Sequence, residues 1–142
     1  MKFLLDSNIL RAYIDQHPVV VRNIERLADE DLYVASVVLA EQLRGRYDAL
    51  SKAEPQHLLR MEERLRETQA TLQRFQVLWL TPIAIAELLR LQPKVNTRKR
   101  HADVIQAALA LAENAVVVTR NTKDFRDLLP ADKLENWIDQ LY

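Results

Sequence analysis

The 142-residue sequence contains no cysteine and only one glycine, Gly45. Without cysteine the chain has no disulfide bond, thiolate zinc site, iron–sulfur cluster or cysteine nucleophile. One glycine also excludes Walker-type phosphate loops and dinucleotide fingerprints, because both place several glycines close together. The three histidines, at positions 17, 57 and 101, form no helical pair, so we expect no histidine-rich metal site. A metal here would need oxygen ligands, which favour magnesium or manganese.

An excess of one charge and long apolar runs are also missing. The 20 basic residues balance the 20 acidic ones, so the chain is not a bulk polycation. No apolar run approaches roughly 18 residues, the length of a membrane-spanning helix, and the stretch 1–5 is too short for a secretory leader. We therefore expect a cytoplasmic protein without membrane contact. Hydrophobic residues make up 49% and charged residues 28%, which is a globular composition that fits one domain over residues 1–142.

Short apolar runs alternate with helical patterns along the chain. Four runs predict strands: Lys2–Leu5, Leu32–Ala35, 77–80 and 115–119. Apolar residues at helical spacing lie between them, and short helices are predicted at 124–129 and 131–141. Strands that are apolar on both faces and separated by helices are typical of a parallel sheet covered on each side. The sequence therefore predicts an α/β fold.

Acidic residues follow the predicted strands. Asp6 comes directly after the first strand, Glu41 lies in the helix after the second, and Asp124 follows the last. Asp103 opens the helix predicted at about 102–113. Because the carboxyl ends of parallel strands share one edge of the sheet, these four acids could converge there. Clustered carboxylates repel one another unless a cation binds them, and magnesium takes one or two carboxylates plus water and substrate oxygens.

Each acid also has an ordinary structural explanation. Asp6 and Asp124 could cap the helices that follow them, and Asp103 in a first helical turn suits the helix dipole. Glu41 could pair with Arg44, one turn further along its helix. What favours a metal site is the combination, since four unrelated helix features need not meet at one edge of a sheet.

Four segments, in this order, resemble the motifs of PIN-domain nucleases, above all the small VapC-type ribonuclease toxins of prokaryotic toxin–antitoxin pairs. They are residues 4–8 (LLDSN), 36–41 (SVVLAE), 102–108 (ADVIQAA) and 118–125 (VTRNTKDF). The resemblance implies a PIN-like three-layer α/β/α sandwich with a parallel sheet of four to five strands. It also implies an endoribonuclease that hydrolyses RNA phosphodiester bonds with Mg²⁺ or Mn²⁺, and a cognate antitoxin as partner.

Matched to these motifs, the residues implied for catalysis and metal binding are Asp6, Glu41, Asp103 and Asp124. Ser7, Thr119 and Asn121 match supporting polar positions. One common form of the family has an aspartate where this chain has Asn121. Whether Asn121 or Asp124 is the fourth site residue is therefore open at the level of sequence.

A basic segment precedes the third motif. Arg98, Lys99 and Arg100 stand directly before Asp103, so they would border the acidic pocket and contact the phosphates of RNA. The ordinary alternative is a solvated basic surface. No aromatic residue interleaves with the segment, which favours backbone contacts over base stacking.

Two other functions fit parts of the pattern. A non-catalytic α/β interaction module would use the heptad-like helix from Leu58 to Phe75 as its partner surface. The same stripe, together with pairing among members of the resembled family, leads us to expect a homodimer. A receiver-like phosphotransfer domain also places acids at strand ends, but its acidic pair is missing because Ser7 and Asn8 follow Asp6. Metal binding that depends on Asp6 would distinguish the nuclease from the module.

Overall fold

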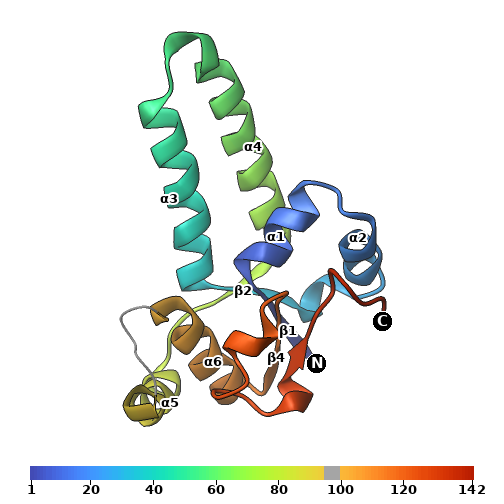
Figure 1. The fold of residues 1–142 in the computed structure, drawn as a ribbon, viewed down its shortest axis with the longest axis vertical. Helices are drawn as coiled ribbons and strands as arrows, with labels where there is room; N and C mark the ends of the chain where they lie inside the picture. Colours follow the sequence, from blue (N-terminus) through green and yellow to red (C-terminus); the bar gives the residue numbers. More distant parts are fainter. Residues whose placement is uncertain (95–99) are drawn as a thin grey trace.

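A computed structural model describes residues 1–94 and 100–142 of the chain. The strands are β1 (Lys2–Leu5), β2 (Leu32–Ala35), β3 (Gln76–Leu78), β4 (Ala115–Val118) and β5 (Leu134–Glu135). The α-helices are α1 (Ser7–Ile14), α2 (Pro18–Glu25), α3 (Ser36–Lys52), α4 (Leu58–Arg74), α5 (Pro82–Leu91) and α6 (His101–Glu113) (Figure 1). Short 3₁₀ turns are η1 (Asp29–Asp31), η2 (Pro55–His57), η3 (Gln92–Lys94), η4 (Thr122–Asp124) and η5 (Ala131–Lys133).

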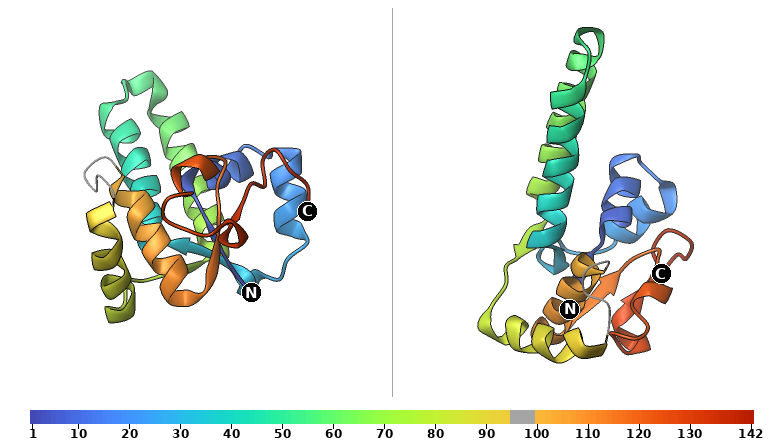
Figure 2. Two further views of the ribbon diagram at one scale, coloured as in Figure 1. Left: turned by 60° about the horizontal axis from the view of Figure 1, so that its bottom comes forward. Right: turned by 60° about the vertical axis from the view of Figure 1, so that its left-hand side comes forward.

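The five strands form one parallel sheet in the order β3-β2-β1-β4-β5. The chain adds β2 and β3 on one side of β1 and then returns to add β4 and β5 on the other side. Figures 1 and 2 show α5 and α6 on the face opposite α1 and α2. This placement is expected because crossovers between parallel strands are right-handed, and the two crossovers run in opposite directions across the sheet. The predicted three-layer α/β/α arrangement is confirmed. The order reverses between β1 and β4, and such switch points are where open parallel sheets bind ligands.

The core is densest around β4 and α6. All four residues of β4 are buried, as are seven consecutive residues of α6, from Val104 to Ala110. Alanines at 107, 108 and 110 leave α6 narrow enough to lie close to the sheet and to α5. A helix enclosed in this way cannot rotate without opening the core, so the side chains of its first two turns have fixed positions.

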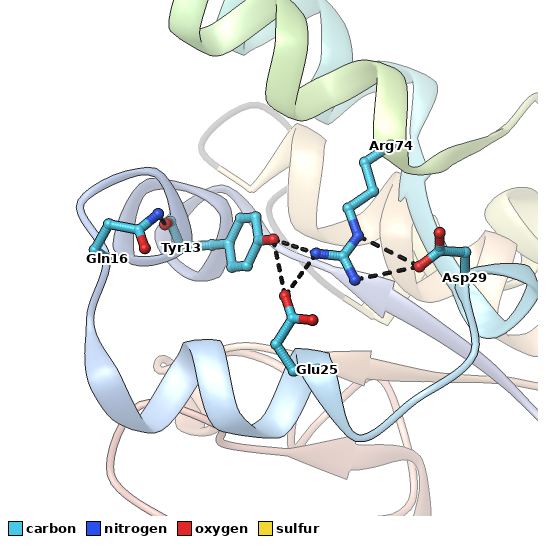
Figure 3. Close-up of polar contacts among 5 residues, drawn as sticks. All are labelled: Tyr13, Gln16, Glu25, Asp29 and Arg74. Atoms are coloured by element: carbon cyan, nitrogen blue, oxygen red, sulfur yellow. Dashed lines mark hydrogen bonds and ion pairs between the residues drawn. The ribbon is translucent and has the colours of Figure 1, made fainter.

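Helices α3 and α4 form an antiparallel hairpin that extends away from the sheet (Figure 1 and the right view of Figure 2). Arg74, at the end of α4, attaches the base of the hairpin to the α1–α2 region. Its guanidinium group lies 2.8 Å from Glu25 and 3.2 Å from Asp29, and it also donates to the Tyr13 hydroxyl (Figure 3). The Tyr13 ring packs edge-on against Phe75, with 5.8 Å between the ring centroids.

The apolar stripe of α4 is used mainly within the chain. Thr68, Leu72 and Phe75, near the base of the hairpin, are buried. Towards the tip, Leu58 is 41% exposed and its neighbour Leu59 is 84% exposed. Packing of α4 against α3 therefore accounts for most of the stripe. Within the described residues no helix is both long and apolar enough to span a bilayer.

The prediction of two helices at the end of the chain is wrong. Residues 125–129 form turns, and the second segment contains η5 and then β5, which pairs with β4. Asn136 accepts from the backbone N–H groups of Ile138 and Asp139, and this local bonding competes with a helix. The predicted third strand is also displaced, since β3 ends at Leu78 and leaves Trp79 and Leu80 exposed.

Candidate functional site

Asp6 stands where β1 ends and α1 begins. Its backbone N–H donates to the carbonyl oxygen of Val118 at 2.9 Å, which continues the β1–β4 ladder by one bond. Its side chain accepts from the backbone N–H of Ser7 at 2.8 Å and so caps α1. The predicted cap is therefore present, but it uses only part of the hydrogen-bonding capacity of the carboxylate.

Four donors surround this carboxylate. Oδ1 accepts from Ser7 N–H at 2.8 Å and from Gln106 Nε2 at 3.0 Å. Oδ2 accepts from Thr119 Oγ1 at 2.8 Å and from Asn8 Nδ2 at 3.4 Å. Asp6 is only 8% exposed, and a carboxylate so enclosed is stable only when donors replace the lost water. These bonds connect β1, α1, α6 and the end of β4 at a single point.

Gln106 and Asn8 were not predicted as site residues. Asn8 lies inside the first motif, and besides contacting Asp6 it donates to Thr119 Oγ1 and accepts from the N–H of Arg120. Gln106 follows Asp103 by three residues, a spacing that places both on one face of α6. An amide at this position of the third motif was the feature of the sequence that could have identified Gln106 as a site residue. Among the described residues, Gln106 Oε1 is buried without a hydrogen-bond partner.

Asp103 lies half-buried in the first turn of α6. Burial, followed by the negative charges of Asp6 and Asp124 and, more weakly, of Glu41, raises the pKa of its carboxyl group to about 6, and Arg100 only partly opposes this. The three other predicted acids are thus within electrostatic reach of Asp103. Unlike Asp6, Asp103 has no hydrogen-bond donor in the described part of the chain that would offset the repulsion.

Glu41 reaches the same edge from α3. It is exposed, and its Oε2 accepts from the Ser7 hydroxyl at 3.0 Å. The ordinary explanation, a pair with Arg44, does not hold because the acid nearest to Arg44 is Asp48, at 3.9 Å. The contact between Ser7 and Glu41 thus joins the first turns of α1 and α3 beside the acids of α6.

Asp124 ends the short turn η4 and is half-buried. No α-helix follows it, so the cap that sequence alone allowed is absent. Arg100 donates to the Asp124 carbonyl oxygen and holds the Asp127 carboxylate at 2.8 and 2.9 Å. Asn121 has an exposed side chain, and its backbone N–H donates to Thr119 Oγ1 at 3.1 Å. Arg98 and Lys99 lie outside the described residues.

The chemistry of this cluster suits a hard divalent cation. Its donors are carboxylate, hydroxyl and amide oxygens, which are the ligands that magnesium and manganese take. Over residues 1–94 and 100–142 no three acidic or histidine side chains stand in ready-made ligand geometry. The acids are close enough to repel but are not closed into a cage. A cation would relieve the repulsion at Asp103, and the residues therefore fit a metal completed by water and substrate oxygens.

The sequence matches the PIN domain over residues 3–128. Ribonuclease VapC2 of Rickettsia felis is 29% identical over 142 residues, covering 96% of this chain and 98% of that protein. A crystal structure of VapBC2 from Rickettsia felis, bound to a promoter DNA fragment, has a TM-score of 0.72 at 27% identity, covering 96% of this chain and 99% of that chain. DNA-bound VapBC from Salmonella typhimurium, at 23% identity, has the same fold, with a TM-score of 0.73 and 96% and 98% coverage.

Replacing Asp103 by asparagine should stabilise the metal-free protein at pH 8. The folded-state pKa of Asp103 is about 6 against 3.8 for a free side chain, so its ionisation opposes folding increasingly as the pH rises from 4 to 6. After allowance for solvent screening we expect a gain of about 1–2 kcal/mol, measured by thermal unfolding in the presence of a chelator. The gain should vanish below pH 4, where both states are protonated.

The matched comparison is Asp6→Asn at the same pH. The amide of asparagine has one oxygen in place of two, so some of the buried donors around position 6 would lose their acceptor. The melting temperature should therefore fall. A rise for Asp6→Asn, or no gain for Asp103→Asn at pH 8, would contradict this description of the two acids.

Proposed function

The chain belongs to the PIN domain family, and from this premise we propose that it is a metal-dependent endoribonuclease that hydrolyses RNA phosphodiester bonds. The observation that carries the proposal is the set of repelling carboxylates around Asp103, at the switch point between β1 and β4. Similarity to Ribonuclease VapC2 supports the choice of RNA as substrate. A non-catalytic module would gain nothing from unrelieved repulsion at this edge, and the base of its supposed partner surface on α4, at Thr68, Leu72 and Phe75, is buried within the chain.

We propose that Asp6, Glu41, Asp103 and Asp124 hold Mg²⁺ or Mn²⁺. When bound, such a cation polarises a phosphoryl oxygen and lowers the pKa of a water molecule so that it can act as nucleophile near neutral pH. The supporting residues act on the acids themselves. Thr119 fixes the Asp6 carboxylate through its hydroxyl, and Ser7 orients Glu41.

For the fourth acid we propose Asp124, with Asn121 as a neutral positioning residue. The negative charge of Asp124 contributes to the raised pKa of Asp103, which supports a place at the same cation. The backbone N–H of Asn121 donates to Thr119 Oγ1, and the Thr119 hydroxyl in turn donates to the Asp6 carboxylate. We further propose that Arg98 and Lys99 contact RNA phosphates, and that Arg100 does so while also positioning the loop from Asp124 to Asp127.

Asp103→Asn should abolish Mn²⁺-dependent cleavage of RNA, as should a chelator, because an amide cannot supply the charge that holds the cation. Asp124→Asn should reduce cleavage and raise the Mn²⁺ concentration required. The readout is a gel assay on RNA across a Mn²⁺ series, and Asp132→Asn, an exposed acid on η5, is the control expected to match the parent. Full activity in purified Asp103→Asn would refute the site. Unchanged metal dependence in Asp124→Asn would transfer the fourth role to Asn121.

We propose that residues 1–142 act as one cytoplasmic nuclease unit, the toxin of a toxin–antitoxin pair, bound by an antitoxin and working as a homodimer. The structural neighbours that are complexes with antitoxins support the partner. The surface that supports pairing is the end of β3 with α5. There Trp79, Ile83 and Leu89 are 64%, 66% and 61% exposed, unusual for side chains of this size.

Light scattering should give twice the mass of one chain, and Ile83→Glu should give the mass of a single chain because a charge would be buried at the seam. Leu59→Glu, at the exposed tip of α4, is the matched control and should stay dimeric. Loss of the dimer in Leu59→Glu alone would place the seam at the exposed tip of α4. A monomeric parent would remove the homodimer proposal.

A further inference from the structure

A pocket opens beside the acidic cluster, next to Glu41. It is lined by Arg11 of α1, by Glu41, Gln42, Gly45 and Arg46 of α3, and by Arg64 of α4; we call it the arginine pocket. Arg11 lies one turn after Ser7, and Gly45 lies one turn after Glu41. Since the Ser7 hydroxyl contacts Glu41, the pocket is the next turn of the same two helices, about 5–6 Å further from the sheet.

Three arginines line this pocket against a single acid, Glu41, so its lining carries a net positive charge. Among the described residues, Arg11, Arg46 and Arg64 form no ion pair. Arg46 is half-buried, and its Nε donates to Thr68 Oγ1 at 3.0 Å. Burial, followed by the positive charges of Arg64 and Arg11, lowers the pKa of Arg46, and the negative charges of Asp15 and Glu67 oppose this only in part. Guanidinium groups that line one pocket repel one another, and a bound anion would offset that repulsion.

Gly45 leaves the α3 side of the pocket without a side chain. It is the only glycine in the chain and lies in the middle of α3, where glycine is a poor helix former. A Cβ atom placed there would meet nothing within 4 Å, so packing within the chain does not require glycine. What the missing side chain provides is space, which lets a ligand approach the α3 backbone between the arginines.

We propose that the arginine pocket binds a backbone phosphate of the RNA strand, adjacent to the phosphate that is cleaved at the acidic cluster. This inference rests on the proposed nuclease function. Guanidinium groups match phosphate oxygens in both charge and geometry. Glu41 belongs to both the pocket and the acidic cluster, so a strand lying along α1 and α3 passes directly from one to the other. Contacts of this kind position the strand without reading its sequence.

The test compares two double variants in an Asp103→Asn background, which keeps the RNA intact. Arg11→Gln with Arg64→Gln removes two charges from the pocket, and Arg46 is kept because it bonds to Thr68. Arg44→Gln with Arg66→Gln removes two exposed charges from α3 and α4 outside the pocket. Binding of a fluorescent single-stranded RNA is measured by anisotropy over a salt series. Because the pocket holds one phosphate, the pocket variant should flatten the slope of log affinity against log salt by up to about 0.7 units, and the control should leave the slope unchanged.

A second pair of variants fills the pocket without changing its charge. Gly45→Leu and Gly45→Ala should both raise the melting temperature, because each replaces glycine in a helix. Only Gly45→Leu extends into the pocket, so it should bind RNA distinctly more weakly than Gly45→Ala. A stable Gly45→Leu protein with weakened RNA binding cannot be explained by misfolding.

Equal slopes in both double variants, with unchanged binding by Gly45→Leu, would overturn the inference. If the parent still cleaves RNA with Mn²⁺ in that case, the nuclease proposal stands and only the pocket assignment fails. The inference would also be overturned if the pocket variant kept the salt dependence of RNA binding but lost binding to poly-glutamate. The pocket would then bind an acidic peptide. A parent that cannot bind RNA would overturn both.

Discussion

The buried carboxylate of Asp6 is the constraint on which the site depends. A negative charge placed between β1, α1, β4 and α6 would oppose folding unless donors from those elements converged on it. Ser7, Gln106 and Thr119 converge in this way, each within 3.0 Å. The bonds that stabilise this carboxylate also set the positions of the helices at the switch point. The geometry of the edge thus follows from satisfying one charge.

The neighbouring charges are not satisfied in the same way. Asp103 keeps a pKa raised to about 6, and one turn further from the sheet three arginines line the same pocket as Gly45. Folded chains rarely retain such like-charge crowding except where function requires it. The two clusters have opposite sign and share Glu41. Together they suit a ligand with two phosphates, one bound through a cation at the acidic cluster and one bound directly by the arginine pocket. A strand of RNA has both.

Much of this could be predicted from the sequence, because β1, β2 and β4 are apolar runs and acids stand directly after them. Gln106 was missed because its partner Asp6 lies 100 residues away. The arginine pocket was missed because its residues come from three helices, α1, α3 and α4, that meet only in the folded chain. The terminal helices were predicted wrongly because β5 forms only by pairing with β4, a contact that local periodicity does not encode.

The most direct test is calorimetry of Mg²⁺ binding in two buffers with different ionisation enthalpies, at about pH 5.5. With a pKa of about 6, Asp103 is mostly protonated there, so a cation that takes it as a ligand should release more than about half a proton. Asp103→Asn should bind more weakly and release markedly less. Tight binding without proton release, or equal release by Asp103→Asn, would contradict a cation site that includes Asp103.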